Sequence, residues 1–127
     1  MNSRQLKIII IDDENIVGKR LKQAFEKDGY EVVTFVDPEE ALDYYNENYA
    51  DIIVTDIRMD KIDGIELLDR VQSDSGGTKI IVITGYATIE IAREALTKGA
   101  YDFIAKPFKP SDLRVIVDRA AKELTAV

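Results

Sequence analysis

The sequence predicts an α/β protein of the flavodoxin-like (βα)5 class, in which a doubly wound parallel sheet carries helices on both faces. Short apolar runs alternate five times with segments whose apolar residues recur every three or four positions. Two of the runs, at 7–11 and 79–83, are almost continuously apolar, as is typical of strands that are buried on both faces. Right-handed crossovers leave few topologies for five such strands, and 2-1-3-4-5 is the leading strand order.

The first strand and helix are clearly patterned. Residues 7–11 include four consecutive isoleucines, and the strand ends at acidic residues. Apolar side chains fall on one helix face within residues 14–27, and Gly29 supplies the left-handed conformation that ends this helix. A short β-rich run then predicts a second strand at 31–35.

The middle of the chain predicts two more strands and two more helices. An aspartate N-cap followed by a proline begins a helix over residues 37–48. An apolar strand at 52–55 delivers a carboxylate, Asp56, to its tip. After a loop, a helix covers residues 65–72, and a further apolar strand follows at 79–83.

The last third predicts two helices around the fifth strand. A helix over residues 88–98 is ended by Gly99. Its expected apolar stripe is Ala92, Ala95 and Leu96. The fifth strand covers 101–105, and Ser111 or Asp112 is expected to cap the final helix, whose apolar stripe is the most regular in the chain.

The composition indicates one globular domain that spans residues 1–127, with no apolar run long enough to cross a membrane. The absence of cysteine and histidine excludes thiol chemistry, imidazole catalysis and phosphohistidine carriers as self-contained functions. A net charge of -7 disfavours direct binding to nucleic acid. The N-terminus lacks the apolar region of a signal peptide, so a cytoplasmic location is expected.

Polar side chains collect where the predicted strands end. Asp12 and Asp13 follow the first strand, Asp56 the third, Thr84 the fourth and Lys106 the fifth. In a doubly wound sheet, ligands bind outside the carboxyl ends of the strands where the strand order reverses, here between the first and third strands. These five side chains are therefore expected to converge on one crevice.

The chemistry of this set indicates a phosphoryl-transfer site. Three carboxylates within a few ångströms cannot all ionise comfortably, so either one takes up a proton or a cation is bound. Oxygen ligands without sulfur or imidazole favour Mg²⁺ as that cation. Lys106 and Thr84 then match an anion, and Asp56, central among the strand tips, is the best-placed nucleophile for phosphorus.

Four motifs resemble the receiver domain of two-component response regulators, and the resemblance covers residues 8–124. The motifs are Ile-Ile-Asp12-Asp13-Glu14, Val54-Thr-Asp56-Ile-Arg-Met with Asp63-Gly64 following, Ile83-Thr84-Gly85 and Lys106-Pro107-Phe108. The resemblance implies that Asp56 accepts a phosphoryl group from a sensor histidine kinase. It also implies that Asp13, Asp56 and the backbone carbonyl of Arg58 ligate Mg²⁺, while Asp12 holds metal-bound water.

The same resemblance implies a conformational switch and no enzymatic turnover beyond self-phosphorylation and self-dephosphorylation. Thr84 is expected to move towards the phosphoryl group and to let Phe103 turn inward, although a phenylalanine in a strand is also an ordinary core residue. The surface of the helix at 88–98, the fifth strand and the final helix would then change. That surface is a candidate for a homodimer or for an effector domain in cis or in trans. Its candidate apolar residues are Ile89, Ile91 and Tyr101, although ordinary packing explains these three equally well.

The sequence between and beyond the motifs refines the resemblance. The tracts after Ile83 and Lys98 look most like receivers of sigma-54-dependent transcription activators of the nitrogen-regulator type. Asp60 replaces the usual proline of the family, and Ile62 replaces its usual methionine, so a more mobile loop is expected.

Two large side chains occupy positions that, in the family, flank the path of the water that hydrolyses the phosphoaspartate. They are Arg58 and Tyr86. Because both are bulky, slow autodephosphorylation is expected, with solvated loop side chains of no such role as the alternative.

Two other functions use similar elements. A haloacid-dehalogenase-like phosphatase also places a nucleophilic aspartate and Mg²⁺ at strand ends, but Asp12-Asp13-Glu14 does not meet its Asp-x-Asp motif. A flavodoxin would bring a flavin phosphate against Asp12 and Asp13, where repulsion opposes binding.

Overall fold

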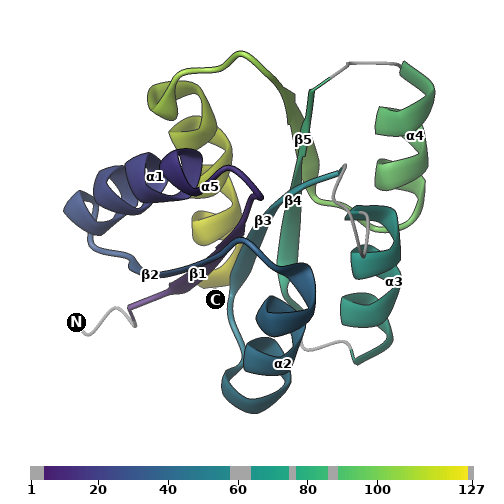
Figure 1. Cartoon of the computed structure of the whole chain (residues 1–127), viewed down its shortest axis with the longest axis horizontal. Helices are drawn as coiled ribbons and strands as arrows, with labels where there is room; N and C mark the ends of the chain where they lie inside the picture. Colours follow the sequence, from purple (N-terminus) through teal and green to yellow (C-terminus); the bar gives the residue numbers. More distant parts are fainter. Residues whose placement is uncertain (1–4, 58–63, 75–76, 86–88, 126–127) are drawn as a thin grey trace.

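Five parallel strands form one sheet in the order β2-β1-β3-β4-β5, which confirms the expected topology. The computed structural model describes residues 5–57, 64–74, 77–85 and 89–125. Along the chain the elements are β1 (Lys7–Ile11), α1 (Asn15–Lys27), β2 (Glu31–Phe35), α2 (Pro38–Asn48), β3 (Ile52–Asp56), α3 (Gly64–Asp74), β4 (Lys79–Thr84), α4 (Ile89–Thr97), β5 (Asp102–Ala105) and α5 (Pro110–Thr125). Figure 1 shows α1 and α5 on one face of the sheet and α2, α3 and α4 on the other.

The four isoleucines of β1 divide between the two faces of the sheet, because successive side chains of a strand point to opposite sides. Ile8 and Ile10 belong to the buried cluster under α1 and α5. Ile9 and Ile11 belong to the buried cluster under α2, α3 and α4. All four side chains are at most 1% exposed, which is why a continuous apolar run predicts a central strand here.

Two strands extend one residue further than the sequence predicts, and both extra residues are polar. Asp56 ends β3 and pairs in register with Ile83 of β4. Thr84 ends β4 and pairs with Ala105 of β5. Sheet pairing, not a loop, therefore fixes the backbone of both polar tips.

Most helix ends follow the predicted signals. Gly29 and Gly99 have φ angles of +96° and +106°, which confirms the left-handed stops after α1 and α4. Asp37 caps α2, since its carboxylate accepts a hydrogen bond from the N–H of Glu39 at 2.9 Å. In the part of the chain that the structure describes, no helix is both long and apolar enough to cross a membrane.

The predicted cap of the last helix is wrong. α5 begins at Pro110, so Ser111 and Asp112 lie inside its first turn. Proline is well suited to the first helical position, because its missing N–H would have no partner there. The Asp112 carboxylate instead reaches back and accepts a hydrogen bond from the N–H of Lys109 at 2.9 Å.

The predicted apolar stripe of α4 is also partly wrong. Ala95 is fully buried, but the neighbouring Leu96 is 42% exposed. The two positions are about 100° apart around the helix axis, so Ala95 faces the core while Leu96 turns away from it. The side chain of Ala92 lies outside the described residues.

Candidate functional site

Asp12 and Asp13 leave the sheet where β1 ends. The backbone N–H of Asp12 still donates to the carbonyl of Phe35 in β2, at 3.1 Å. Its side chain folds back, because the carboxylate oxygen Oδ1 accepts a hydrogen bond from the N–H of Glu14 at 2.8 Å. This local turn keeps Asp12 only 1% exposed, whereas Asp13 is exposed at the surface of the same edge.

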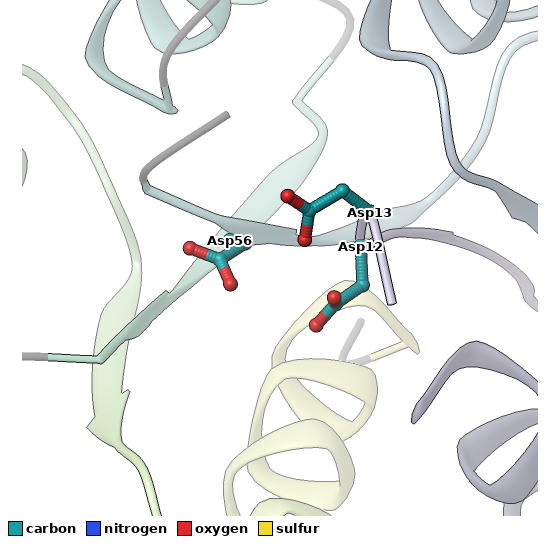
Figure 2. A group of neighbouring side chains, drawn as sticks. All are labelled: Asp12, Asp13 and Asp56. Carbon is teal, nitrogen blue, oxygen red and sulfur yellow. The ribbon is translucent and has the colours of Figure 1, made fainter. Parts of the chain in front are cut away.

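Asp56 meets this pair from the neighbouring strand. It is 6% exposed, and the chain beyond it is held by a hydrogen bond from the N–H of Ile57 to the carbonyl of Ile83 at 2.9 Å. One carboxylate oxygen from each of Asp12, Asp13 and Asp56 lies within 4.8 Å of the other two. Figure 2 shows the three side chains gathered where β1 and β3 end. The structure therefore brings together three acids that come from two adjacent strands.

Lys106 brings a positive charge from the end of β5. Its N–H donates to the carbonyl of Thr84 at 2.8 Å, and the peptide bond to Pro107 is cis. The ammonium nitrogen Nζ lies 3.0 Å from Asp56 Oδ2, 3.4 Å from Asp12 Oδ2 and 3.5 Å from Glu14 Oε1. One lysine thus neutralises part of a cluster of four carboxylates.

Two pKa values in the site are raised, for different reasons. Burial raises the pKa of Asp12, and the nearby Asp56 charge adds to this, while the Glu14 N–H and Lys106 oppose it. Burial by itself lowers the pKa of Lys106. The hydrogen bond to Asp56 and the charges of Asp12, Asp56 and Glu14 together outweigh that effect, so the pKa of Lys106 is raised.

Thr84 and Phe103 lie beside this cluster in different environments. Thr84 is 1% exposed, and among the described residues its hydroxyl oxygen has no hydrogen-bond partner. A buried hydroxyl without a partner is costly, so this group is available to bond a ligand at the end of β4. Phe103 is half-buried and packs against the core under α2, α3 and α4.

The acidic cluster fits a hard divalent cation. Its donors are carboxylate oxygens only, and the buried Asp12 Oδ2 has no hydrogen bond within the described chain. Such a donor set suits Mg²⁺, which prefers oxygen ligands and keeps several waters. A cation would also relieve the repulsion among ionised carboxylates that Lys106 alone only partly offsets.

Not every predicted site residue can be placed. The structure confirms the juxtaposition of Asp12, Asp13, Asp56 and Lys106, and it places Thr84 at the same edge of the sheet. The predictions for Arg58, Asp60, Ile62 and Tyr86 concern residues outside the described ranges, as do the side chains of Ile89 and Ile91.

One contact in the site was not predicted from the sequence. Glu14 forms an ion pair with Lys106, which lies more than ninety residues away in the chain. The only sequence signal was that Glu14 is the third acid in the run after β1. That signal does not reveal which way a long side chain turns.

Comparison with known proteins identifies relatives over nearly the whole chain. Residues 8–118 match the family described as the response regulator receiver domain. The chain is 39% identical over 114 residues to the regulatory protein AtoC of Escherichia coli (strain K12), covering 90% of this chain and 25% of AtoC. It is 35% identical over 119 residues to the nitrogen assimilation regulatory protein NtrX of Azorhizobium caulinodans, covering 92% of this chain and 26% of NtrX. The chain thus spans about a quarter of the length of these relatives.

Solved structures show the same arrangement of strands and helices. A CheY-like response regulator receiver domain protein from Methanospirillum hungatei JF-1 superimposes with a TM-score of 0.89 at 31% identity, covering 94% of this chain and 96% of that one. A receiver domain protein from Clostridium thermocellum gives a TM-score of 0.87 at 30% identity, covering 94% and 96%.

Proposed function

The chain belongs to the family of response regulator receiver domains, which are phosphorylation-activated switches, and we propose that Asp56 is the residue that accepts the phosphoryl group. The observation that carries this proposal is the position of its carboxylate. It lies with Asp12 and Asp13 in the acidic cluster and is 3.0 Å from the Lys106 ammonium. A nucleophile for phosphorus needs positive charge close by, because negative charge builds up on the transferring group. We extend the proposal to residues 1–127 as one receiver domain.

In the proposed reaction, an Asp56 oxygen forms a bond to phosphorus as the bond from phosphorus to the donor breaks. The donor would be the phosphohistidine of a sensor kinase, and its ring nitrogen would keep the electron pair. Lys106 would bind a phosphoryl oxygen, and the Thr84 hydroxyl would donate a hydrogen bond to another. Phosphorylation would thereby give the buried Thr84 hydroxyl a partner.

The acidic cluster would hold Mg²⁺ through Asp13 and Asp56, with Asp12 contributing through a bound water and the backbone carbonyl of Arg58 as a further ligand from outside the described residues. When bound, Mg²⁺ supplies charge that neutralises the phosphoryl oxygens. The carboxylates of this chain fix where that charge is placed.

The regulatory role that we propose for this receiver is based on the names of its relatives. AtoC, NtrX and the C4-dicarboxylate transport regulator DctD of Rhizobium meliloti are named as regulatory proteins, the last as transcriptional. We therefore propose that this receiver controls an effector domain, in cis or in trans, in the regulation of transcription in the cytoplasm. The movement of Thr84 and Phe103 would alter the α4, β5 and α5 surface, which would contact the effector or a second copy.

The proposed chemistry is confined to Asp56 itself. The family match gives no support to a haloacid-dehalogenase-like phosphatase or to a flavodoxin. A phosphatase would turn over many molecules of an external phosphate ester, whereas a receiver gains and loses one phosphoryl group.

The direct test is to incubate the protein with Mg²⁺ and acetyl phosphate and to measure its intact mass. We expect a gain of one phosphoryl group that is absent in Asp56→Asn and present in Asp43→Asn, a control at an exposed acid of α2. No gain in the wild type, or steady hydrolysis of an unrelated phosphate monoester, would refute the proposal.

A further inference from the structure

Among the residues that the structure describes, Lys106 has three carboxylate neighbours, and one of them stands outside the proposed metal site. Asp12 and Asp56 are buried, whereas the Glu14 side chain is 62% exposed. Its carboxylate oxygen lies 3.5 Å from the ammonium, almost as close as that of Asp12 at 3.4 Å. The lysine is therefore paired with two buried carboxylates and with one exposed carboxylate.

Helix capping does not explain a glutamate at this position. Glu14 occupies the N-cap of α1, yet its side chain makes no capping hydrogen bond. Serine, threonine, aspartate and asparagine are the residues that cap well. The backbone of Glu14 is fixed by the hydrogen bond from its N–H to Asp12 Oδ1, and its side chain extends towards Lys106.

We infer that Glu14 is a positioning residue that holds the Lys106 ammonium beside the acidic cluster and competes for it with an incoming phosphoryl group. The inference rests on the proposed function, in which Lys106 binds a phosphoryl oxygen. Before phosphorylation, Glu14 keeps the lysine aligned over Asp56. Afterwards, the phosphoryl oxygens must draw the same ammonium away from Glu14, so the ion pair weakens binding of the phosphoryl group.

The test measures the affinity for beryllofluoride, a small fluoride complex that mimics a phosphoryl group on a carboxylate. Beryllofluoride is titrated into the full chain at saturating Mg²⁺, and binding is followed in the amide NMR spectrum. An exposed ion pair contributes modestly, so Glu14→Gln should bind the mimic roughly two- to fivefold more tightly than the wild type.

Two further variants distinguish the effect of losing the ion pair from the effect of removing a negative charge near the site. Glu14→Asp keeps the negative charge but shortens the side chain by one methylene group, so it should behave like Glu14→Gln. Glu40→Gln removes another exposed acid, which lines a cavity of about 210 Å³ beside Asp12 but forms no ion pair with Lys106 in the described part of the chain. We expect Glu40→Gln to bind like the wild type.

A double substitution completes a double-mutant cycle between Glu14 and Lys106. In a Lys106→Met background, Glu14→Gln should no longer change the affinity, because the ion pair is already absent. The inference is overturned if Glu14→Asp binds like the wild type while Glu14→Gln binds more tightly, if Glu40→Gln gives the same gain, or if the gain persists without Lys106. Wild-type affinity in both Glu14→Gln and Glu14→Asp would overturn it as well.

The failure of this inference is distinguishable from the failure of the proposed function. If the wild type gains one phosphoryl group on Asp56, and Glu14→Gln and Glu14→Asp bind beryllofluoride as tightly as the wild type, only the role of Glu14 is refuted. If the wild type neither gains that mass nor binds the mimic, the phosphoacceptor site itself is refuted and the role of Glu14 with it.

Discussion

At the scale of single residues, the acidic cluster of Asp12, Asp13 and Asp56 is suited to binding a ligand, and it does not stabilise the fold. Asp12 is buried and lies beside two further carboxylates, and its pKa is raised chiefly by burial. Lys106 offsets only part of this repulsion because its ammonium is shared among Asp12, Asp56 and Glu14. In the absence of a cation, the ionised form of Asp12 therefore lowers the free energy of unfolding.

We predict that Asp12→Asn raises the free energy of unfolding of the metal-free protein at pH 7 by about 1 kcal/mol, a typical size for a single substitution, because it removes a charge that burial disfavours. Asparagine keeps the oxygen that accepts from the Glu14 N–H, but it carries no charge. Urea unfolding in the presence of a chelator measures the difference.

The difference in free energy of unfolding between Asp12→Asn and the wild type should change with pH in a definite direction. The pKa of Asp12 in the folded protein is raised above its ordinary value of 3.8. The Asp12 carboxyl group therefore stabilises the folded state below pH 3.8, where it is protonated, and this contribution is lost as the pH rises through the folded pKa and the group ionises. The advantage of Asp12→Asn should therefore be absent at low pH and should grow across that window. An advantage that is constant with pH would contradict the electrostatic explanation.

At the scale of elements, the end of α2 carries backbone strain. Tyr49, the residue after the helix, has φ +54° and ψ 160°, a conformation that is essentially confined to glycine. The turn is held because the Tyr49 N–H donates to the carbonyl of Tyr45 at 2.8 Å and the two rings pack with centroids 5.6 Å apart. This turn leads directly into β3, which ends at Asp56.

We predict that Tyr49→Gly is more stable than Tyr49→Ala by about 1 kcal/mol, because only glycine adopts this conformation without strain. Both variants lose the contact with the Tyr45 ring, so the comparison isolates the backbone. Chemical unfolding of the two variants measures the difference.

Glu47, an exposed residue inside α2, provides the matched control. There alanine should be more stable than glycine, by roughly 0.5–1 kcal/mol. The strain explanation would fail if alanine were also the better residue at position 49.

At the scale of the whole molecule, the sheet concentrates negative charge at one edge. The net charge is -7, and three of the carboxylates converge from β1 and β3 within 4.8 Å of one another. The two large apolar clusters on either side of the sheet hold the strands, so the edge cannot spread to relieve the repulsion. The fold thus maintains a site that a cation would stabilise.

We predict that Mg²⁺ at about one hundred times its dissociation constant raises the free energy of unfolding of the wild type by roughly 2.7 kcal/mol, since it binds the folded state alone. Asp13→Asn should lose most of this gain. Asp13 is exposed, so its substitution removes a ligand without disturbing the core.

The comparison is made at matched ionic strength with sodium chloride, and Asp43→Asn serves as the control for removal of an exposed acid. If Asp13→Asn gained as much stability from Mg²⁺ as Asp43→Asn, the ion would be acting by screening the net charge and not at the acidic cluster.

The sequence by itself determined the strand order, the two-sided burial of β1 and the edge at which the polar tips meet. These features depend on local periodicity and on the handedness of crossovers, which a single chain carries in its pattern of apolar residues. Asp12, Asp13, Asp56 and Lys106 could be assigned to one crevice because each lies at or just beyond the carboxyl end of a strand.

The tertiary structure alone decided how those side chains are paired. Three features depend on side-chain rotamers and on distances between segments far apart in the chain. They are the ion pairs that Lys106 forms with Asp12, Asp56 and Glu14, the orientation of the Glu14 side chain towards Lys106, and the exposure of Leu96. The strained turn at Tyr49 likewise has no signal in the sequence, where a glycine would be expected. Local pattern places a residue on an element, but only packing between elements determines which charges come within reach of one another.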